Sequence, residues 1–581
     1  MLTKITIRNF KRFDDVEIEL GSPVVFIGPN NSGKTSALQA LALWDVGLKR
    51  WNEKRKGKTA PEKRPGVTIN RRDLITVPVP DADLLWRNLR TRDVQKENGR
   101  QRTQNIRIET IVEGVTDGQD WQCGLEFDYA NEESLYCRPL RTAESADAER
   151  MPVPEAASTV RIAFLPPMSG LAANETRLDP GAIHVRLGEG RTAEVLRNLC
   201  YLIVSGGTPD RDLMSQWSRI CDRIRDLFGA SLDPPKYIPE RGEIEMTYRE
   251  SSGVRLDLSS AGRGLQQTLL LLAHLAVNPQ SVLLLDEPDA HLEILRQRQT
   301  YQLLTDFARE QSSQIIAASH SEVVLNEAAD RDVVVAFVGR PHRIDDRGSQ
   351  ILKSLKEIGF DSYYQAELTG WVLYLEGSTD LSILRALART LEHPAATLLE
   401  RPFVHYVSNQ PPKAREHFFG LREAKPDLVA LSLFDHLDHP LQDGADLREY
   451  MWQRREIENY VCTREALLQW ASQASAEYAG GPLFAGEWRG VMERCIERVA
   501  EAMATLGKGS PWDAGTKVSD DFLEPLFEMF FRELRLPNLM RKSGYHALAP
   551  HLTNEEIVPE VSHVLDLIVD VASRARQAAE G

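Results

Sequence analysis

The sequence predicts an α/β protein whose chain forms two units, each with a mostly parallel sheet. In the first half, a short apolar strand runs into a glycine-rich loop and a helix, and helices and buried strands alternate over residues 265–318. The same alternation begins again near residue 370 and continues to residue 434. Such alternation is typical of sheets covered by helices. We therefore expect two successive α/β units.

Composition places the chain among globular proteins. Its 581 residues are 42% hydrophobic and 27% charged, enough for about two to four domains. The 70 basic and 85 acidic residues give a net charge of -15, so contact with nucleic acid would depend on local basic patches. Six cysteines without metal-binding spacing favour a reducing compartment, and no segment resembles a signal peptide or a membrane span. We expect a cytoplasmic protein with no membrane partner.

Apolar periodicity predicts the individual elements. In the first unit we expect strands at 2–8, 16–20, 24–27, 106–127, 282–285 and 315–318, and helices at 36–44, 192–204, 212–228, 265–276 and 292–311. In the second unit we expect strands at 372–375, 403–407 and 428–434, and helices at 381–391, 413–423 and beyond 457. Segments 49–72 and 87–102 are predicted surface insertions, and 144–157 a weakly structured connector.

The strongest motif is a phosphate-binding loop at Gly28–Thr35, in the order strand, loop, helix. In the pattern GxxxxGK[ST], backbone N–H groups curl around the phosphates of a nucleotide such as ATP. We expect Lys34 to reach the β/γ-phosphates and Thr35 to coordinate Mg²⁺. The nucleotide contacts are predicted for Asn30, Asn31, Ser32, Gly33, Lys34 and Thr35.

Two acids end a later apolar strand, at Asp286 and Glu287. Their position suits Asp286 to a magnesium ligand and Glu287 to a catalytic base that polarises the attacking water. Upstream, Ser260, Gly262 and Gly264 lie just before a helix and could present donors at its N-terminus, although a simple capping turn is the plainer interpretation. His320 follows the next strand.

This ordered set resembles the ATPase heads of the ABC superfamily, in the branch of RecF and the structural-maintenance-of-chromosomes (SMC) proteins. The opening Ile5-Thr-Ile-Arg-Asn-Phe10-Lys-Arg-Phe13 is similar to that branch as well. The resemblance implies ATP-dependent self-association, in which Ser260, Gly262 and Gly264 close over the ATP of a second subunit. It implies further that residues 289–292 lie at the seam and that His320 contacts the γ-phosphate. It divides the head into a first lobe at 1–175, an inserted helical dimerisation region at 176–240 and a second lobe at 241–365.

Carboxylates follow two strands of the second unit. Glu376 ends one strand, Asp380 lies one helical turn later, and Asp435 and Asp438 follow another strand. The carboxyl ends of parallel strands meet in the crevice where α/β proteins bind ligands. Such acids repel one another unless cations neutralise them, which favours a Mg²⁺ or Mn²⁺ site over acids that merely cap helices.

Residues 366–581 resemble a Toprim domain with a helical C-terminal extension. Glu376 matches that family's glutamate and Asp435 the first acid of its DxD element, but Leu437 stands at the second acid and Asp438 comes one residue late. The resemblance implies metal ligands at Glu376, Asp380, Asp435, Asp438 and Glu458, with Glu458 favoured over Glu456. Farther on, Ser519-Asp520-Asp521 and Arg541-Lys542 supply another acid and a cation, and Lys542 fits the family's late catalytic lysine.

An ATPase head joined to a Toprim unit resembles the overcoming-lysogenization-defect (OLD) family of nucleases, and is similar in organisation to the Gabija antiphage nuclease subunit. The resemblance implies metal-dependent DNA cleavage regulated by ATP, head-mediated dimers or tetramers, an accessory protein partner and antiphage defence. The alternative is an ATP-gated scaffold or sensor whose Toprim domain is inactive, which the departure at Leu437 supports. An SMC-like DNA tether is disfavoured, since no long heptad repeat separates the lobes.

Two clusters could bind DNA phosphates. One comprises Lys54, Arg55, Lys56, Lys58, Lys63 and Arg64, and the other Arg87, Arg90, Arg92, Arg100 and Arg102. Each would give salt-sensitive affinity without sequence preference, and solvated insertions are an equally good interpretation.

Overall fold

We describe the chain from a computed structural model. It describes residues 1–55, 66–97, 100–142, 149–205, 213–250, 253–328, 331–344, 358–442, 444–478, 484–553 and 555–577. The chain divides into two compact units, unit 1 at Met1–Leu352 with Ala579–Gly581 and unit 2 at Lys353–Ala578. The finer division of the head at residues 175, 240 and 365 stays a prediction. No helix in the described part of the chain is long and apolar enough to cross a membrane.

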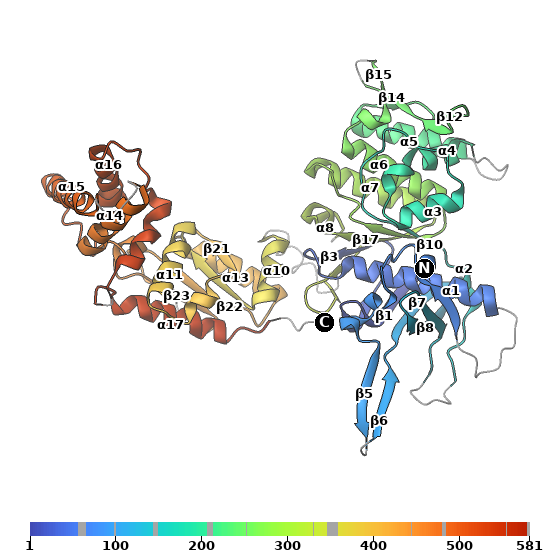
Figure 1. The fold of residues 1–581 in the computed structure, drawn as a ribbon, viewed down its shortest axis with the longest axis horizontal. Helices are drawn as coiled ribbons and strands as arrows, with labels where there is room; N and C mark the ends of the chain where they lie inside the picture. The colour runs from blue at the N-terminus through green and yellow to red at the C-terminus, as the bar shows by residue number, and fades with distance from the viewer. Residues whose placement is uncertain are drawn as a thin grey trace. The chain divides into compact units, whose positions relative to one another are not determined.

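Unit 1 contains an antiparallel sheet in the order β2-β1-β7-β8-β9-β4. Its strands are β1 (Leu2–Phe10), β2 (Phe13–Glu19), β4 (Val67–Asn70), β7 (Ile108–Thr116), β8 (Gln119–Asn131) and β9 (Ser134–Pro139). Alternate residues of β8, such as Cys123, Leu125 and Phe127, are buried in the core, as period-two patterning requires. A separate hairpin of β5 (Arg92–Glu97) and β6 (Arg100–Asn105) extends away from this sheet (Figure 1).

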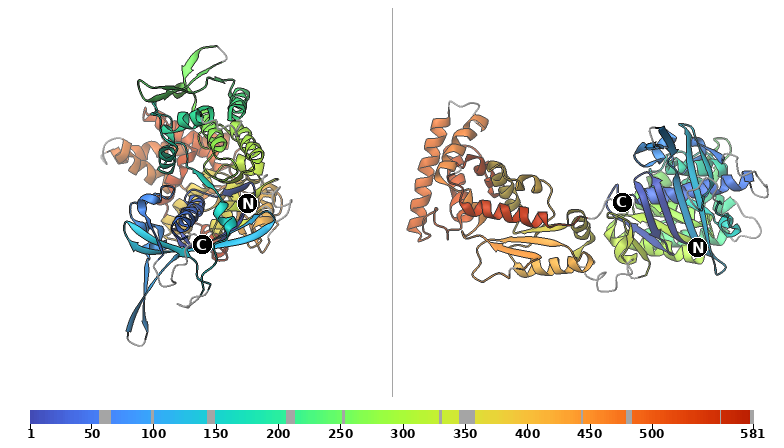
Figure 2. Two further views of the ribbon diagram at one scale, coloured as in Figure 1. Left: turned by 90° about the vertical axis from the view of Figure 1, so that its right-hand side faces the viewer. Right: turned by 90° about the horizontal axis from the view of Figure 1, so that it is seen from below.

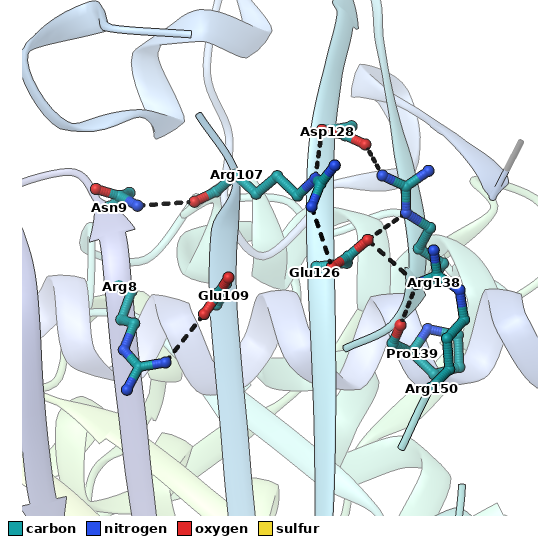
Figure 3. Close-up of polar contacts among 9 residues, drawn as sticks. All are labelled: Arg8, Asn9, Arg107, Glu109, Glu126, Asp128, Arg138, Pro139 and Arg150. Carbon is teal, nitrogen blue, oxygen red and sulfur yellow. Dashed lines mark hydrogen bonds and ion pairs between the residues drawn. The ribbon is translucent and has the colours of Figure 1, made fainter. Parts of the chain in front are cut away.

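The other face of β8 carries a network of ion pairs across neighbouring strands (Figure 3). Glu126 is 1% exposed and accepts hydrogen bonds from Arg138 and from Arg150, the latter at 3.1 Å. Arg107 binds Asp128 at 3.2 Å. Burial opposes the charged form of Glu126, but the hydrogen bond and charge of Arg138 outweigh it and lower the pKa of this carboxyl.

The second sheet of unit 1 has the order β10-β16-β17-β3-β18-β19 and is parallel except for β19. Its strands are β3 (Val24–Ile27), β10 (Ile162–Leu165), β16 (Val282–Asp286), β17 (Gln314–Ser319), β18 (Val333–Ala336) and β19 (His342–Arg343). Helix α1 (Lys34–Arg55) contacts strands of both sheets and is therefore packed between them (Figure 1). It is longer than the predicted 36–44, because its buried face continues through Trp44 to Leu48.

Helices cover the other face of the parallel sheet and form a second core. They are α3 (Pro180–Gly188), α4 (Leu196–Ser205), α5 (Leu213–Phe228), α6 (Arg263–Val277) and α7 (Ile294–Glu310), and α8 (Glu322–Ala328) packs on α7 and β3. Short strands lie beside this layer: β11 (Ser231–Leu232), β12 (Lys236–Ile238), β13 (Glu243–Glu245), β14 (Thr247–Arg249) and β15 (Arg255–Asp257). The small α2 (Glu155–Thr159) falls at the end of the predicted connector.

Unit 2 has a parallel sheet in the order β21-β20-β22-β23. The strands are β20 (Trp371–Leu375), β21 (Val404–Tyr406), β22 (Val429–Phe434) and β23 (Leu447–Met451). One face of the sheet packs on α11 (Ser378–Thr390) and α17 (Pro559–Ser573). Helix α17 runs along the sheet (Figure 2), and α12 (Ala395–Leu398) packs on α17. Helices α10 (Phe360–Thr369) and α13 (Pro411–Ala424) also contact the sheet and each other.

The rest of unit 2 is mainly helical, as expected beyond residue 457. It contains η7 (Ile457–Tyr460), α14 (Arg464–Tyr478), α15 (Ala485–Thr505), the π-helical turn η9 (Ser519–Leu523), α16 (Glu524–Glu533) and η10 (Lys542–His551). An aromatic cluster of Trp470, Trp488, Phe527, Phe530 and Phe531 joins α14, α15 and α16. This helical part shares one core with the sheet, which makes unit 2 a single packed body.

Candidate nucleotide site and acidic site

The phosphate-binding loop joins β3 to α1, as the motif predicts. Gly33 has φ of 106°, and a Cβ there would lie 2.7 Å from Cδ of Arg12, so only glycine fits this turn. The Lys34 ammonium donates to the carbonyl oxygens of Gly28 at 2.6 Å and Pro29 at 2.9 Å. Within the described residues, the buried Ser32 Oγ has no hydrogen-bond partner. A cradle closed to side chains and an unsatisfied hydroxyl fit a nucleotide phosphate.

The acids at the end of β16 lie beside this loop. Thr35 Oγ1 donates to Asp286 Oδ1 at 3.1 Å, which brings together the two predicted magnesium ligands. The pKa of Asp286 is raised to about 6, chiefly by burial and also by the charge of Glu287, against the lowering effects of the Thr35 hydrogen bond and of Lys34. Burial lowers the pKa of Lys34, against the attraction of Glu287, Asp286 and Asp289. These residues fit Mg²⁺ bound with a nucleotide phosphate.

Glu287 and His320 occupy neighbouring strand ends. Glu287 has φ of 49°, an uncommon value for a residue other than glycine, and its amide donates to the Ala318 carbonyl at 2.8 Å. His320 Nδ1 lies 3.8 Å from Glu287 Oε1, and the histidine side chain is half exposed. The parallel pairing of β16 with β17 thus places both predicted catalytic residues at one edge of the sheet.

The segment before α6 forms a separate part of the site. Ser260 ends the 3₁₀ turn η5 (Leu258–Ser260), and Gly262 caps α6. Gly262 and Gly264 line a hollow of about 560 Å³ together with Arg263, His291 and Arg296. Among the described residues, no hydrogen bond or ion pair joins Ser260, Gly262 or Gly264 to the phosphate-binding loop. These residues therefore do not complete the nucleotide site of their own chain by direct contact.

A buried arginine fixes this segment. Arg197 on α4 is 1% exposed and donates through Nη2 to Asp257 Oδ1 at 2.9 Å. The same carboxylate oxygen accepts from the amide of Ser259 at 2.8 Å and from its hydroxyl at 2.6 Å. Asp257 is therefore the capping residue of η5, and the Ser259 hydroxyl is engaged in this cap, whereas Ser260 is exposed. Sequence analysis did not identify Arg197, because its partner lies 60 positions away.

Four of the five predicted acids of unit 2 lie together near the carboxyl ends of β20 and β22. Asp435 shares a hydrogen bond with Glu376, and burial, then Glu376, Asp380 and Glu458, raise the pKa of Asp435 to about 9. Burial and nearby Glu456 raise the pKa of Glu458 to about 7. Burial and Glu376 raise the pKa of Asp380 to about 6. Glu376, Asp380, Asp435 and Glu458 thus form one electrostatically coupled group, the acidic cluster.

Within the described residues, no three His, Cys, Asp or Glu side chains are arranged as the ligand shell of a metal ion. Burial and mutual repulsion raise the pKa values of Asp380, Asp435 and Glu458 in the acidic cluster. A divalent cation would remove this repulsion, so the donor set fits Mg²⁺ or Mn²⁺. Asp380 also accepts from the amide of Glu376 at 3.0 Å, which fixes the turn between β20 and α11.

Three further residues named by the sequence analysis lie at different places relative to the acidic cluster. Asp438 is exposed and is not among the main charges acting on Asp435, so the structure does not bring it into the acidic cluster. Glu456 is engaged by Ser519, whose amide and hydroxyl donate to it at 2.5 and 3.0 Å. Lys542 donates to Ser519 Oγ at 3.2 Å and acts by its charge on Glu458. This supports Glu458 over Glu456 and places Lys542 beside the cluster.

The basic patches are only partly covered by the described structure. Lys56, Lys58, Lys63 and Arg64 lie outside the described residues, as do the side chains of Arg100 and Arg102. Lys54 and Arg55 end α1 and line a hollow of about 560 Å³. Arg87 pairs with Asp14 at 3.6 Å and Arg90 with Asp93 at 3.7 Å. These pairs reduce the positive charge that the second patch can offer to DNA.

Comparisons with known proteins assign unit 1. Residues 1–62 match the AAA ATPase domain family, and residues 93–326 match the family of AAA domains described with the AbiEii toxin of type IV toxin–antitoxin systems. Both matches fall within unit 1, around the phosphate-binding loop and the Asp286–Glu287 strand. Unit 1 is therefore an ATPase domain of the AAA type. No curated protein matches the chain.

Solved structures of SMC heads are also similar to part of the chain. The SMC head domain from Thermotoga maritima has 14% identity and a TM-score of 0.31, and the match covers 59% of this chain and 98% of that one. The Smc head domain bound to the C-terminal domain of ScpA, derived from Pyrococcus furiosus, has 15% identity and a TM-score of 0.34, with 61% and 99% covered. An SmcHead bound to the C-winged helix domain of ScpA has 13% identity and a TM-score of 0.34, with 59% and 97% covered.

Proposed function

We propose that the chain is an ATP-binding, metal-dependent DNA endonuclease whose ABC-type head regulates cleavage by a Toprim domain in unit 2. The observation that carries this proposal is the acidic cluster with Lys542 beside it. Carboxylates gathered near the ends of adjacent parallel strands repel one another, and a bound divalent cation removes that repulsion. The resemblance to the OLD family supports the same conclusion and suggests a role in antiphage defence.

The residues of unit 2 have distinct parts in such a reaction. Glu376, Asp380, Asp435 and Glu458 would hold Mg²⁺ or Mn²⁺, which activates water and stabilises the leaving oxygen when bound. Lys542 presents its ammonium group beside the cluster, where it stabilises negative charge that develops on a scissile phosphate. The Ser519 hydroxyl oxygen accepts a hydrogen bond from the Lys542 ammonium, and the same hydroxyl donates to Glu456.

The residues of unit 1 have the regulatory part. Lys34 would exchange its loop carbonyl contacts for phosphate oxygens, and Thr35 and Asp286 would hold Mg²⁺ with the nucleotide. Glu287 would orient the attacking water, and His320, whose Nδ1 lies 3.8 Å from Glu287 Oε1, would contact the γ-phosphate. In the part of the chain that the structure describes, Ser260, Gly262 and Gly264 form no hydrogen bond with the phosphate-binding loop of their own chain, which supports a second copy as their partner. ATP would then drive self-association of the heads.

A cleavage assay tests the proposal. Supercoiled plasmid is incubated with wild type, Lys34→Ala, Glu376→Gln and the surface variant Lys508→Gln, with Mg²⁺ or Mn²⁺ and with or without ATP. We expect nicking by wild type and Lys508→Gln, no nicking by Glu376→Gln, and a changed ATP response in Lys34→Ala. Intact plasmid with wild type in every metal and nucleotide state would refute the endonuclease.

The second candidate is an ATP-gated scaffold or sensor that holds an accessory effector protein. Leu437 at the position of the second DxD acid, and the exposed Asp438 outside the cluster, favour it. In that case Glu376→Gln leaves effector binding unchanged, and isothermal titration with Mn²⁺ shows no heat that depends on Glu376. Metal binding that Glu376→Gln abolishes would argue against the scaffold.

A further inference from the structure

We propose that Lys517 and Lys542 together form a subsite for a backbone phosphate of nucleic acid, in which Asp520 occupies the phosphate position until DNA binds. This inference rests on the proposed endonuclease function and names a part of its substrate site. Lys517 was not among the residues that the sequence patterns identified.

Both lysines are paired to the same carboxylate. Lys517 Nζ lies 2.5 Å from Asp520 Oδ2, and Lys542 Nζ lies 3.8 Å from Asp520 Oδ1. A phosphodiester resembles this carboxylate in carrying one negative charge on two oxygen acceptors. The three side chains are about half exposed, at 50%, 48% and 48%, so a ligand from solvent can reach them.

The lysine pair is connected to the acidic cluster by hydrogen bonds. Lys542 donates to Ser519 Oγ, and Ser519 donates from its amide and hydroxyl to Glu456, two residues before Glu458. The charges of both lysines act on Glu456, and the charge of Lys517 reaches Glu376 as well. A phosphate held by the pair therefore lies near the carboxylates that are proposed to bind metal.

The energetics favour exchange of Asp520 for a phosphate. The hydrogen bond with Lys517 lowers the pKa of Asp520, so the ion pair is formed at neutral pH. An exposed ion pair of this kind contributes little to stability, so a polyanion that also releases counterions can displace Asp520. A chain with net charge -15 needs such local cations at an acidic site, because its overall field repels DNA.

Opposite effects of two substitutions test the subsite. Binding of a short fluorescent duplex to the full chain is measured by anisotropy over a range of KCl, with Ca²⁺ as the divalent ion. We expect Lys517→Gln to weaken binding about fivefold and to reduce the slope of log K against log salt by about 0.9, as for one lost phosphate contact. Asp520→Asn frees both lysines and should tighten binding by a similar factor.

Matched variants control for folding and for charge alone. Lys508 forms the same kind of pair, with Asp521 at 2.5 Å, so Lys508→Gln should leave affinity and slope unchanged. Lys517→Arg should retain binding. Unchanged binding of Lys517→Gln, or weaker binding of Asp520→Asn, would overturn the subsite. Failure of wild type to cut plasmid refutes the endonuclease instead, and the two results are measured separately.

Discussion

Thr35 Oγ1 donates a hydrogen bond to Asp286 Oδ1 at 3.1 Å, although 251 positions separate the two residues in the sequence. The contact joins the start of α1 to the end of β16 and brings together the two residues that we propose as ligands of Mg²⁺. It forms because β3 and β16 both pair with β17 and end at the same edge of the sheet.

The first prediction concerns the pH dependence of ATP hydrolysis. The pKa of Asp286 is raised to about 6, chiefly by burial, so protons compete with Mg²⁺ for this carboxylate at mildly acid pH. We expect the initial rate to fall as pH falls through about 6, and the midpoint to move to lower pH when Mg²⁺ is raised. Asp286→Asn should reduce the rate about 100-fold or more at all pH values. If the midpoint of this pH profile did not change with Mg²⁺ concentration, Asp286 would not be the Mg²⁺ ligand that limits the rate.

The strand–loop–helix around Gly28–Thr35 and the long buried helices and strands were predictable because they follow local patterns, whereas short elements such as β4, β10 and β18 were not predicted. The strands at 282–285 and 428–434, for example, are predicted by short runs of apolar residues that are adjacent in the sequence. The strand β23 (Leu447–Met451) was missed for a physical reason. Its Glu449 is buried, which no alternation rule predicts, because Arg415 of α13 neutralises it with two hydrogen bonds of 2.6 Å.

The sites were predictable to different degrees. Acids at strand ends converge by topology, so Glu376 and Asp435 could be paired from sequence. Asp438 was also predicted to join them, but its side chain is exposed, and its role stays a prediction. Asp438 lies on an exposed loop beyond β22, where the number of residues from the strand does not determine which way a side chain points. Arg197 and Lys517 were not predicted as site residues, because the roles of both depend on their ion pairs in the folded chain and no sequence periodicity indicates such roles.

The second prediction tests the arginine that fixes the segment before α6. Arg197→Met removes the partner of Asp257 and leaves the buried Glu175 without its nearby positive charge, 3.8 Å away. We expect the free energy of unfolding to fall by about 3–5 kcal/mol, as for a broken buried ion pair. Adding Glu175→Gln should restore part of this loss, which chemical denaturation of the single and double variants can measure. Additive effects would show that the two residues are not coupled.

Asp257→Ala separates stability from function at the same place. It removes the cap of η5, which is worth about 1 kcal/mol, and also the carboxylate that accepts from the buried Arg197, which should cost about 1–3 kcal/mol more. Binding of a fluorescent ATP analogue should persist, since Asp257 makes no contact with the phosphate-binding loop among the described residues, while ATP-dependent self-association should weaken. Light scattering with and without ATP measures the second effect.

The third prediction concerns the stability of unit 2 without metal. The pKa values of Asp380, Glu458 and Asp435 are raised to about 6, 7 and 9, so the folded state binds more protons than the unfolded state over that range. The free energy of unfolding should therefore fall as pH rises from about 5 to 9. Hydrogen exchange of peptides from β20 and β22 in EDTA should show this loss of protection.

Two controls sharpen that measurement. Asp435→Asn removes the carboxyl with the highest pKa. The protection of these peptides from exchange should therefore depend less on pH than in wild type, and should be greater than in wild type at pH 8. Mn²⁺ should protect the same peptides in wild type at pH 8 and have no effect in Asp435→Asn. Protection in wild type that increases with pH in EDTA would mean that the acids are not protonated together as described.

The last prediction decides which acid completes the metal site. Glu458 lies in the cluster, where burial and Glu456 raise its pKa to about 7, whereas Asp438 is exposed outside it. Glu458→Gln keeps the shape of the side chain and removes a charge that a cation needs, so Mn²⁺ affinity should fall about 10- to 100-fold and plasmid nicking with it. Asp438→Asn should change both by less than about twofold. Titration calorimetry and nicking rates of the two variants measure these effects. If Asp438→Asn lost as much Mn²⁺ affinity and nicking as Glu458→Gln, the loop after β22 would have to close onto the acidic cluster when metal binds.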